Sequence, residues 1–175
     1  MCIRDRIVMV WSKIQGQRNS VAAGDFLDWQ HGSTAFQGLA AFSGESLNLA
    51  TASHPEQVQG RRATPGFFSV MGQPLLLGRE FLPEEGEVGK DHEAILTYRF
   101  WMDRFAGDRT IVGTTIKLNG EPYTVVGVLA PGAADRGREK LTVPLAFKPE
   151  QINHDFHWLL VMGRLKPGVT VARCV

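Results

Sequence analysis

The stretch that decides the fold is Ile116-Lys-Leu-Asn-Gly-Glu-Pro-Tyr-Thr-Val-Val-Gly-Val-Leu-Ala-Pro131. Asn119-Gly120 at its centre is a strong β-hairpin signal, because a type I′ turn requires a positive φ at both of its central residues. Apolar and polar residues alternate on both sides of this dipeptide, with Ile116, Leu118, Tyr123 and Val125 as the apolar set. Alternation of this kind is typical of strands with one buried face. The segment therefore predicts a β-hairpin.

The residues upstream of the hairpin predict a capped helix. The segment Thr97-Tyr-Arg-Phe-Trp-Met-Asp-Arg-Phe-Ala-Gly-Asp108 begins with a threonine, whose hydroxyl can accept a hydrogen bond from an N–H of the first turn. Gly107 is the kind of residue that ends a helix. Trp101 and Phe105 are one turn apart, so they lie on the same face of this helix. The helix follows a short apolar strand at Glu93–Leu96.

The rest of the chain predicts further strands and helices. Further strands are expected at residues 7–11, 46–51, 57–63, 140–147 and 158–165, the first of them buried. Within residues 140–147, Pro144 favours an edge position in a sheet because proline cannot donate to the ladder. Pro83 to Asp91 is acidic and contains glycine, and we expect it to be an exposed loop.

Four other helices are predicted from capping signals. The first starts at Ser20 and continues to about His31, and the second starts at Ser33 or Thr34 and carries the apolar residues Phe36, Leu39 and Ala40. The third has Thr64 as its N-cap with Pro65 at the first helical position, and it ends at Gly72. Thr170 predicts the start of a fourth helix at the end of the chain.

Composition indicates a globular protein and argues against nucleic-acid binding. The chain has 175 residues, of which 43% are apolar, and a formal net charge of +1, so it has no strongly basic surface for DNA or RNA. No run approaches the ~20 apolar residues that cross a bilayer, and we expect no signal peptide. Cys2 lies in the terminal segment Met1–Arg6 and Cys174 in the terminal segment Arg173–Val175, and both segments fit poorly with the adjoining sequence. A disulfide between the two cysteines is neither predicted nor excluded.

The sequence contains no catalytic motif. The phosphate-binding patterns G-x-x-x-x-G-K followed by Ser or Thr, and G-x-G-x-x-G, are both missing, as is the nucleophile elbow G-x-S-x-G. The residues Phe26, Trp29, Phe36, Phe67, Phe68, Trp101 and Phe105 fall at helical spacings and are interpreted as core. We therefore expect no catalytic, cofactor-binding or metal-binding residues, no cofactor and no enzyme activity.

Several groups of polar residues are candidates for functional sites. His154-Asp-Phe-His157 has the composition of a metal site, but such a site needs three or four converging ligands, and a polar loop is the preferred interpretation. A metal-dependent hydrolase that uses His154 and His157 remains an alternative. Asp25 and Asp28 are assigned to the first turns of a helix, where the dipole favours negative charge. The pairs Glu84-Glu85 and Arg61-Arg62 are interpreted as surface charges, and His31, His54 and His92 as solvated.

The hairpin and helix together resemble the periplasmic core domain of MacB-like ABC transporter permeases of the FtsX/MacB type, including the acidobacterial-type permease group. The resemblance rests on the capped helix with its tryptophan, the Gly107-Asp108 turn, and the strands Gly113-Thr-Thr-Ile-Lys-Leu-Asn-Gly120 and Tyr123-Thr-Val-Val-Gly-Val128. Three further landmarks occur in the order of the family: Asp25–Trp29 with Phe36–Phe42, Thr64–Gly72 with Leu77–Phe81, and Arg164–Val171.

This resemblance implies an α+β fold with two lobes. Residues 7–76 plus 156–175 would form a porter-like βαβ lobe, in which the second βαβ unit is truncated, and residues 77–155 an inserted β-rich lobe. The domain would lie on the periplasmic side of the inner membrane, between the first and second transmembrane helices of a permease.

The resemblance also implies a mechanical function in export or efflux, in which the domain relays ATP-driven transmembrane movement to substrates or partner proteins without catalysis. The implied partners are the transmembrane helices of the full-length chain, a cytoplasmic ABC ATPase, a periplasmic adaptor with an outer-membrane channel, and a second copy in a homodimer. The alternative is a soluble periplasmic module that binds a ligand between its lobes. Nothing in the sequence selects a transported substrate.

Overall fold

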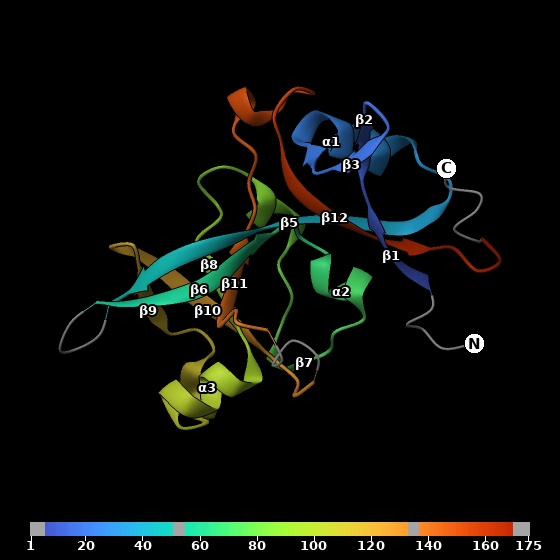
Figure 1. The fold of residues 1–175 in the computed structure, drawn as a ribbon. Helices are drawn as coiled ribbons and strands as arrows, with labels where there is room; N and C mark the ends of the chain where they lie inside the picture. The colour runs from blue at the N-terminus through green and yellow to red at the C-terminus, as the bar shows by residue number, and fades with distance from the viewer. Residues whose placement is uncertain (1–5, 51–54, 133–136, 170–175) are drawn as a thin grey trace.

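The computed structural model describes residues 6–50, 55–132 and 137–169, and these residues form one large mixed sheet with short helices against it (Figure 1). The strand order is β1-β12-β5-β6-β11-β8-β10-β7, while β4 pairs with β12 and β9 pairs with β10 and β5. The strands of this sheet are β1 (Ile7–Val10), β4 (Val21–Ala22), β5 (Phe36–Leu49), β6 (Glu56–Ala63), β7 (Leu75–Gly78), β8 (Glu93–Leu96), β9 (Thr115–Leu118), β10 (Glu121–Leu129), β11 (Leu141–Pro144) and β12 (His157–Leu165).

The remaining elements are short. A separate hairpin is formed by β2 (Ser12–Ile14) and β3 (Gln17–Asn19), and the α-helices are α1 (Ala23–Gly32), α2 (Phe67–Met71) and α3 (Tyr98–Phe105). Three 3₁₀ turns are labelled η2 (Pro83–Gly86), η3 (Arg109–Ile111) and η5 (Pro149–Gln151). The mixed α+β class expected from the sequence is confirmed, with strands in the majority. None of the helices in the described ranges is long and apolar enough to cross a bilayer.

The hairpin predicted at the centre of the sequence is present as β9 and β10. Asn119 and Gly120 have φ values of 52° and 87°, as a type I′ turn requires. Leu118 and Glu121 face each other across the turn. The predicted alternation is also observed, because Ile116, Leu118, Tyr123 and Val125 are all buried.

The helix upstream of the hairpin is confirmed as α3. The Thr97 hydroxyl accepts a hydrogen bond from the Phe100 N–H at 3.4 Å, which makes it the N-cap. Ala106 and Gly107 have positive φ values and end the helix. Trp101 is buried, and its indole N–H donates to the Asp108 carbonyl oxygen at 2.8 Å.

The helix predicted from Ser33 or Thr34 is wrong, because residues 36–49 form the long strand β5. β5 pairs with β12 along one edge and with β6 along the other. Leu39, Ala40 and Ala41 are consecutive and all buried, since apolar residues cover both faces of this central strand. A strand buried on both faces shows a continuous apolar run, which periodicity alone cannot distinguish from a buried helix.

Two predicted helices begin later than their capping signals suggested. α1 starts after Ala22, which makes no side-chain cap, and Ser20 precedes β4. α2 starts after Gly66, while the Thr64 hydroxyl accepts a hydrogen bond from the Ala41 N–H at 3.0 Å. Thr64 therefore joins β6 to β5 and does not cap the helix, whereas Gly72 ends α2 as expected.

Three smaller expectations also need correction. β1 is a strand as predicted, but it lies at the edge of the sheet and Met9 is 41% exposed. β11 is an inner strand between β6 and β8, and Pro144 is tolerated because it is the last residue and the pairing with β8 ends at Thr142. The acidic segment from Pro83 is not wholly exposed, because Glu85 is buried against Arg79.

The other strands expected near residues 46–51, 57–63 and 158–165 are confirmed in β5, β6 and β12. Buried apolar residues form three clusters: one around α3, β9 and β10, one around α2, and one around α1 and β12. The helix expected from Thr170 lies outside the described residues. The division of the chain into two lobes stays a prediction.

Candidate functional site: a histidine–aspartate cluster and an adjoining groove

The loop before β12 is folded so that His154 lies against the start of α1. The Asn153 side-chain oxygen accepts hydrogen bonds from the main-chain N–H groups of Asp155 (3.1 Å) and Phe156 (2.8 Å), which closes a tight turn. The Gly24 N–H donates to the Asn153 carbonyl oxygen at 2.9 Å. A Cβ atom at position 24 would lie 2.8 Å from His154 Cε1, so this contact requires glycine.

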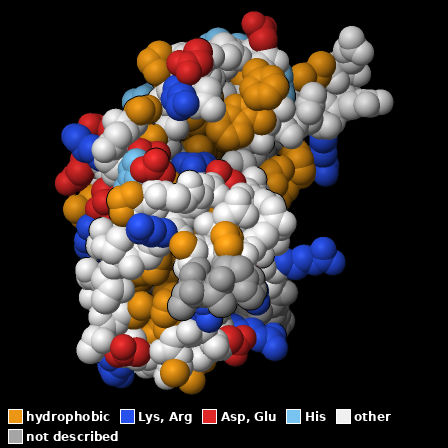
Figure 2. Space-filling model, turned by 90° about the vertical axis from the view of Figure 1, so that its left-hand side faces the viewer, with side chains coloured by type: hydrophobic (Ala, Val, Ile, Leu, Met, Phe, Trp, Pro, Cys, Tyr) orange, Lys and Arg blue, Asp and Glu red, His pale blue; other side chains and the backbone are white. Residues whose placement is uncertain are grey.

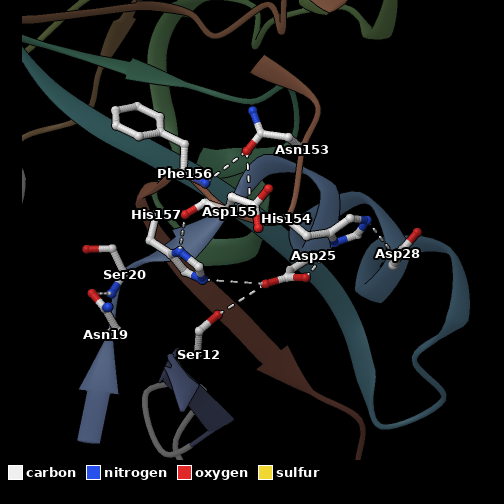
Figure 3. Close-up of polar contacts among 10 residues, drawn as sticks. All are labelled: Ser12, Asn19, Ser20, Asp25, Asp28, Asn153, His154, Asp155, Phe156 and His157. Carbon is white, nitrogen blue, oxygen red and sulfur yellow. Dashed lines mark hydrogen bonds and ion pairs between the residues drawn. The ribbon is translucent and has the colours of Figure 1, made fainter. Parts of the chain in front are cut away.

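Asp25 connects three segments that are far apart in the sequence (Figure 3). Its Oδ1 atom lies 2.7 Å from His154 Nδ1, and its Oδ2 atom lies 3.9 Å from His157 Nε2. The Ser12 hydroxyl donates to Oδ2 at 3.4 Å. Asp28, one helical turn later, lies 3.8 Å from His154 Nε2. The cluster thus joins the β2–β3 hairpin, α1 and the loop before β12.

The carboxylates of α1 favour the charged form of His154. The hydrogen bond that His154 donates to Asp25 raises the pKa of His154 above its ordinary value of 6.5. Desolvation, the next largest effect, lowers this pKa, and attraction by Asp25, Asp28 and Asp155 raises it further. A raised pKa in the folded state means that this interaction stabilises the fold below the ordinary histidine pKa. That contribution is lost as the pH rises through the folded-state value.

The geometry is that of an ion pair. His154 directs Nδ1 at Asp25, whereas His157 Nδ1 lies 2.9 Å from the carbonyl oxygen of Asp155. Among residues 6–50, 55–132 and 137–169, no three His, Cys, Asp or Glu side chains are placed to hold a metal ion together. The polar-loop interpretation of His154–His157 describes this arrangement, with the addition that the loop is anchored to α1. What the cluster can do chemically is respond to pH.

The two successive arginines of β6 are not the surface pair that the sequence suggested. The Arg61 guanidinium lies 5.0 Å from the ring centre of Phe42 and 5.2 Å from that of Phe67, and it pairs with Glu139 at 2.9 Å. Arg62 forms an ion pair with Glu45 and lies 3.7 Å from Asp91. Both arginine side chains are only 20–26% exposed, and long-range partners of this kind leave no signal in the sequence.

The other histidines and aromatic residues mostly follow expectation. His31 and His92 are at least partly exposed, His31 lying 2.7 Å from the Leu27 carbonyl oxygen and His92 5.0 Å from the ring centre of Tyr123. His54 lies outside the described residues. Of the aromatic residues predicted as core, Phe26, Phe67, Phe68 and Trp101 are buried, while Trp29, Phe36 and Phe105 are half-buried at the margins of the clusters.

An open groove of about 710 Å³ lies next to the histidine loop. Its charged residues are Arg62, Glu45, Asp91 and Lys148, and the remaining lining is both polar, with Ser43 and Gln151, and apolar, with Trp158 among others. The indole nitrogen of Trp158 is buried and has no hydrogen-bond partner in the part of the chain that the structure describes. No local pattern in the sequence indicates this groove, because its lining comes from β5, β6, β12 and two loops.

Charged side chains of both signs lie between hydrophobic ones on the face shown in Figure 2, which therefore has no continuous basic patch.

Three solved structures share this fold. The periplasmic region of MacB from Actinobacillus actinomycetemcomitans aligns with a TM-score of 0.69 at 13% identity, covering 97% of this chain and 78% of that one. A domain of a putative permease from Porphyromonas gingivalis aligns with a TM-score of 0.70 at 16% identity, over 98% and 77% of the two chains. The extracellular domain of the noncanonic ABC-type transporter YknZ from Gram-positive bacteria gives 0.64 at 12% identity, over 93% and 84%.

A comparison with curated proteins finds no match. The family model of the MacB-like periplasmic core domain, in contrast, matches residues 3–174, which is nearly the whole sequence. The resemblance seen in the hairpin, the capped helix and the three further landmarks is thereby confirmed. The chain belongs to the family of MacB-like periplasmic core domains of ABC transporter permeases.

Proposed function

We propose that this domain is a non-catalytic relay, which transmits ATP-driven movement of transmembrane helices to substrates or partner proteins in export. The observation that carries the proposal is the pairing of the first and last strands. β1 and β12 are antiparallel neighbours, with Ile7 opposite Arg164 and Val10 opposite Val161. Segments that lead into β1 and out of β12 therefore meet the domain at one end of the same sheet.

A movement applied to this end has a continuous path through the sheet. β12 pairs with the first half of β5, and β5 pairs with β6 from Phe42 to Leu49. The Arg164 Nε–H, buried on β12, donates to the Val70 carbonyl oxygen at 2.9 Å, which joins α2 to the same path. We propose that these hydrogen-bonded strands move together, so that a displacement at β12 reaches the far end of β5.

We propose the two-lobed division on the same basis. Residues 7–76 plus 156–175 would be the lobe that receives the movement, and residues 77–155 the inserted lobe that presents it to partners. Leu47, Leu49 and Val58 of the β5–β6 hairpin pack in the cluster formed mainly by residues of the inserted segment, which supports coupling between the two. The proposed partners are the transmembrane helices of the full-length permease, its ATPase, an adaptor with an outer-membrane channel, and a second copy.

The test is a distance measurement in the full-length permease with its ATPase. Asp103→Cys places a spin label on α3, where the native side chain is 66% exposed and far from β1 (Figure 1). Cys2 and Cys174 are replaced by serine. We expect the label-to-label distance within the homodimer to change by several ångströms between the nucleotide-free state and the state trapped with ATP and vanadate.

The control is the same labelled permease with an ATPase that cannot bind nucleotide, in which the distance should stay constant. Identical distance distributions in the two nucleotide states of the active complex would contradict the relay. A label that reports no second copy at all would contradict the homodimer, and the relay would then be tested with a second label at the membrane end of the domain.

A further inference from the structure

One edge of β5 is open in the middle of the large sheet. β6 pairs with β5 from Phe42 to Leu49 along one edge. Along the opposite edge, the pairing with β12 extends from Phe36 to Phe42, and β9 is opposite β5 only at Leu49. Among the described residues, therefore, no strand pairs with residues 43–47 on that edge.

The main-chain groups that face the open edge belong to Gly44 and Ser46. Ala41 directs its main chain to the β6 side, because its carbonyl oxygen accepts from the Thr64 N–H at 2.9 Å. Asn48 directs its main chain to the β9 side, where its carbonyl oxygen accepts from the Asn119 N–H at 2.8 Å. Main-chain groups alternate along a strand, so residues 44 and 46 face the same side as residue 48.

Both of these residues are exposed to solvent. A Cβ atom added to Gly44 would meet no atom within 4 Å, so the face of the sheet to which this residue points is also uncovered here. Two N–H donors and two carbonyl acceptors are thus available, about 7 Å apart along the strand. An unpaired edge of this kind is a template for another strand.

The groove described above begins at this edge. Its lining includes Ser43, Gly44 and Glu45 of β5, Trp158 and Leu160 of β12, and Leu145. Val88, which is 56% exposed, adds a further apolar side chain.

We propose that an extended segment of a partner polypeptide binds here by adding a short strand to β5. Main-chain hydrogen bonds to Gly44 and Ser46 would hold the segment, and its alternate side chains would enter the groove, where apolar ones would contact Trp158, Leu160 and Val88. The gap spans five residues, or about 17 Å, and β12 and β9 close it at both ends. It therefore fits one short strand and excludes the long sheet edge of a second globular copy.

This inference goes beyond the relay and does not depend on it. β12 and β9 flank the open edge, so the long sheet edge of another molecule cannot pair with it. The open strand can therefore persist without aggregation. The occupant is identified by its extended backbone and alternating apolar pattern. It is a segment of a partner polypeptide that does not belong to a second copy of this domain.

The test is amide hydrogen exchange, measured by NMR on the 175-residue chain. In the free protein, the amides of Gly44 and Ser46 should exchange quickly, while those of Glu45 and Leu47, which face β6, should be protected. The probe is a capped heptapeptide with Val at its second, fourth and sixth positions, Thr between them and Lys at both ends. At about 5 mM peptide, which would populate even a complex with a Kd of roughly 1 mM, exchange at Gly44 and Ser46 should slow at least about threefold.

Two variants of one residue separate main-chain binding from other effects. Ser46→Pro removes the N–H that faces the open edge and leaves the β6 side unchanged, since proline is tolerated at strand edges. Ser46→Ala is the matched control, because both variants lose the same side-chain hydrogen bond from Gln59 Nε2. We expect Ser46→Pro to weaken peptide binding at least about tenfold relative to Ser46→Ala, with the NMR spectrum elsewhere unchanged.

Three results would overturn the proposal: protection of Gly44 and Ser46 in the free protein, a peptide that leaves their exchange unaltered, or equal binding by the two variants. Protection that rises with protein concentration in the absence of peptide would assign the edge to a second copy and would also overturn it. If the NMR spectrum of Ser46→Pro shows that this variant is unfolded, the proposal is tested by the wild-type chain alone. The measurement is then the amide exchange of Gly44 and Ser46 with and without peptide.

Discussion

Both the hairpin end and the α1 end of the molecule have a buried apolar cluster, but the α1 end adds an ion pair with a histidine. At the hairpin end, Leu118, Val125 and Leu141 are fully buried in one apolar cluster with α3. At the α1 end, the loop before β12 is attached through Asp25, His154 and one main-chain hydrogen bond to Gly24. Apolar burial is insensitive to pH, whereas an ion pair with histidine is not. One end of the domain should therefore be constant under conditions that loosen the other.

The largest effect is expected in the hairpin cluster. Leu118→Ala removes a side chain that is 0% exposed, and it should lower the free energy of unfolding by about 2–5 kcal/mol, because it leaves a cavity that the strands cannot close. Lys117→Ala, on the exposed face of the same strand, is the matched control and should change it by less than about 0.5 kcal/mol. Urea denaturation measures both. Equal effects would show that β9 does not belong to the core.

A medium effect is expected where α1 contacts the loop. Gly24→Ala would place a Cβ atom 2.8 Å from His154 Cε1 and 2.9 Å from the Asn153 carbonyl oxygen, so the loop must move. We expect a loss of about 1–3 kcal/mol in the same denaturation experiment. Gly32→Ala, at the other end of α1, meets no atom within 4 Å and should leave stability unchanged or slightly raise it. A Gly24→Ala variant as stable as the wild type would show that the loop packs less closely than described.

The smallest effect is expected from the histidine itself, and it should depend on pH. The raised pKa of His154 stabilises the fold at about pH 5.5, and this contribution should disappear as the pH rises past the folded-state pKa. His154→Gln should therefore remove part of the stability that the wild type has at low pH and cost little at about pH 8.5. Thermal unfolding across this range measures the difference.

His31→Gln is the control for this pH effect, because His31 contacts only the main chain of its own helix among the contacts described, the Leu27 carbonyl oxygen. A pH dependence that is identical in His154→Gln and the wild type would assign the effect to other groups. It would also contradict the claim that an ion pair of His154 stabilises the α1 end of the domain.

The same two ends show what a sequence can predict. Asn119-Gly120 and Thr97 act on their immediate neighbours, so the hairpin, the capped helix and the family resemblance could all be deduced from consecutive residues. The contact between Asp25 and His154 joins positions 129 apart, and no local pattern encodes it. The sequence identifies both residues as polar candidates. They come into contact only because the folded sheet places β12 beside α1.

The incorrect helix at Phe36–Phe42 has a related cause. Its apolar residues suit a helix face equally well, and the choice is made by β12 and β6, which pair with both edges of β5. Thr64 shows the same effect on a smaller scale, since its hydroxyl is used by Ala41 on a neighbouring strand and is not available to cap α2. Tertiary pairing overrides local propensity wherever a strand is central to the sheet.

The successive arginines of β6 have a consequence for the long β5–β6 hairpin. Arg61 and Arg62 point to opposite faces of the sheet. Arg61 pairs with Glu139 on one face, and Arg62 pairs with Glu45 and Asp91 on the other. Sliding β6 by one residue along β5 would exchange the faces of all its side chains and separate both arginines from their carboxylates. The ion pairs of Arg61 and Arg62 therefore oppose a change in the register between β5 and β6. They would keep the two strands aligned when a force acts along the hairpin.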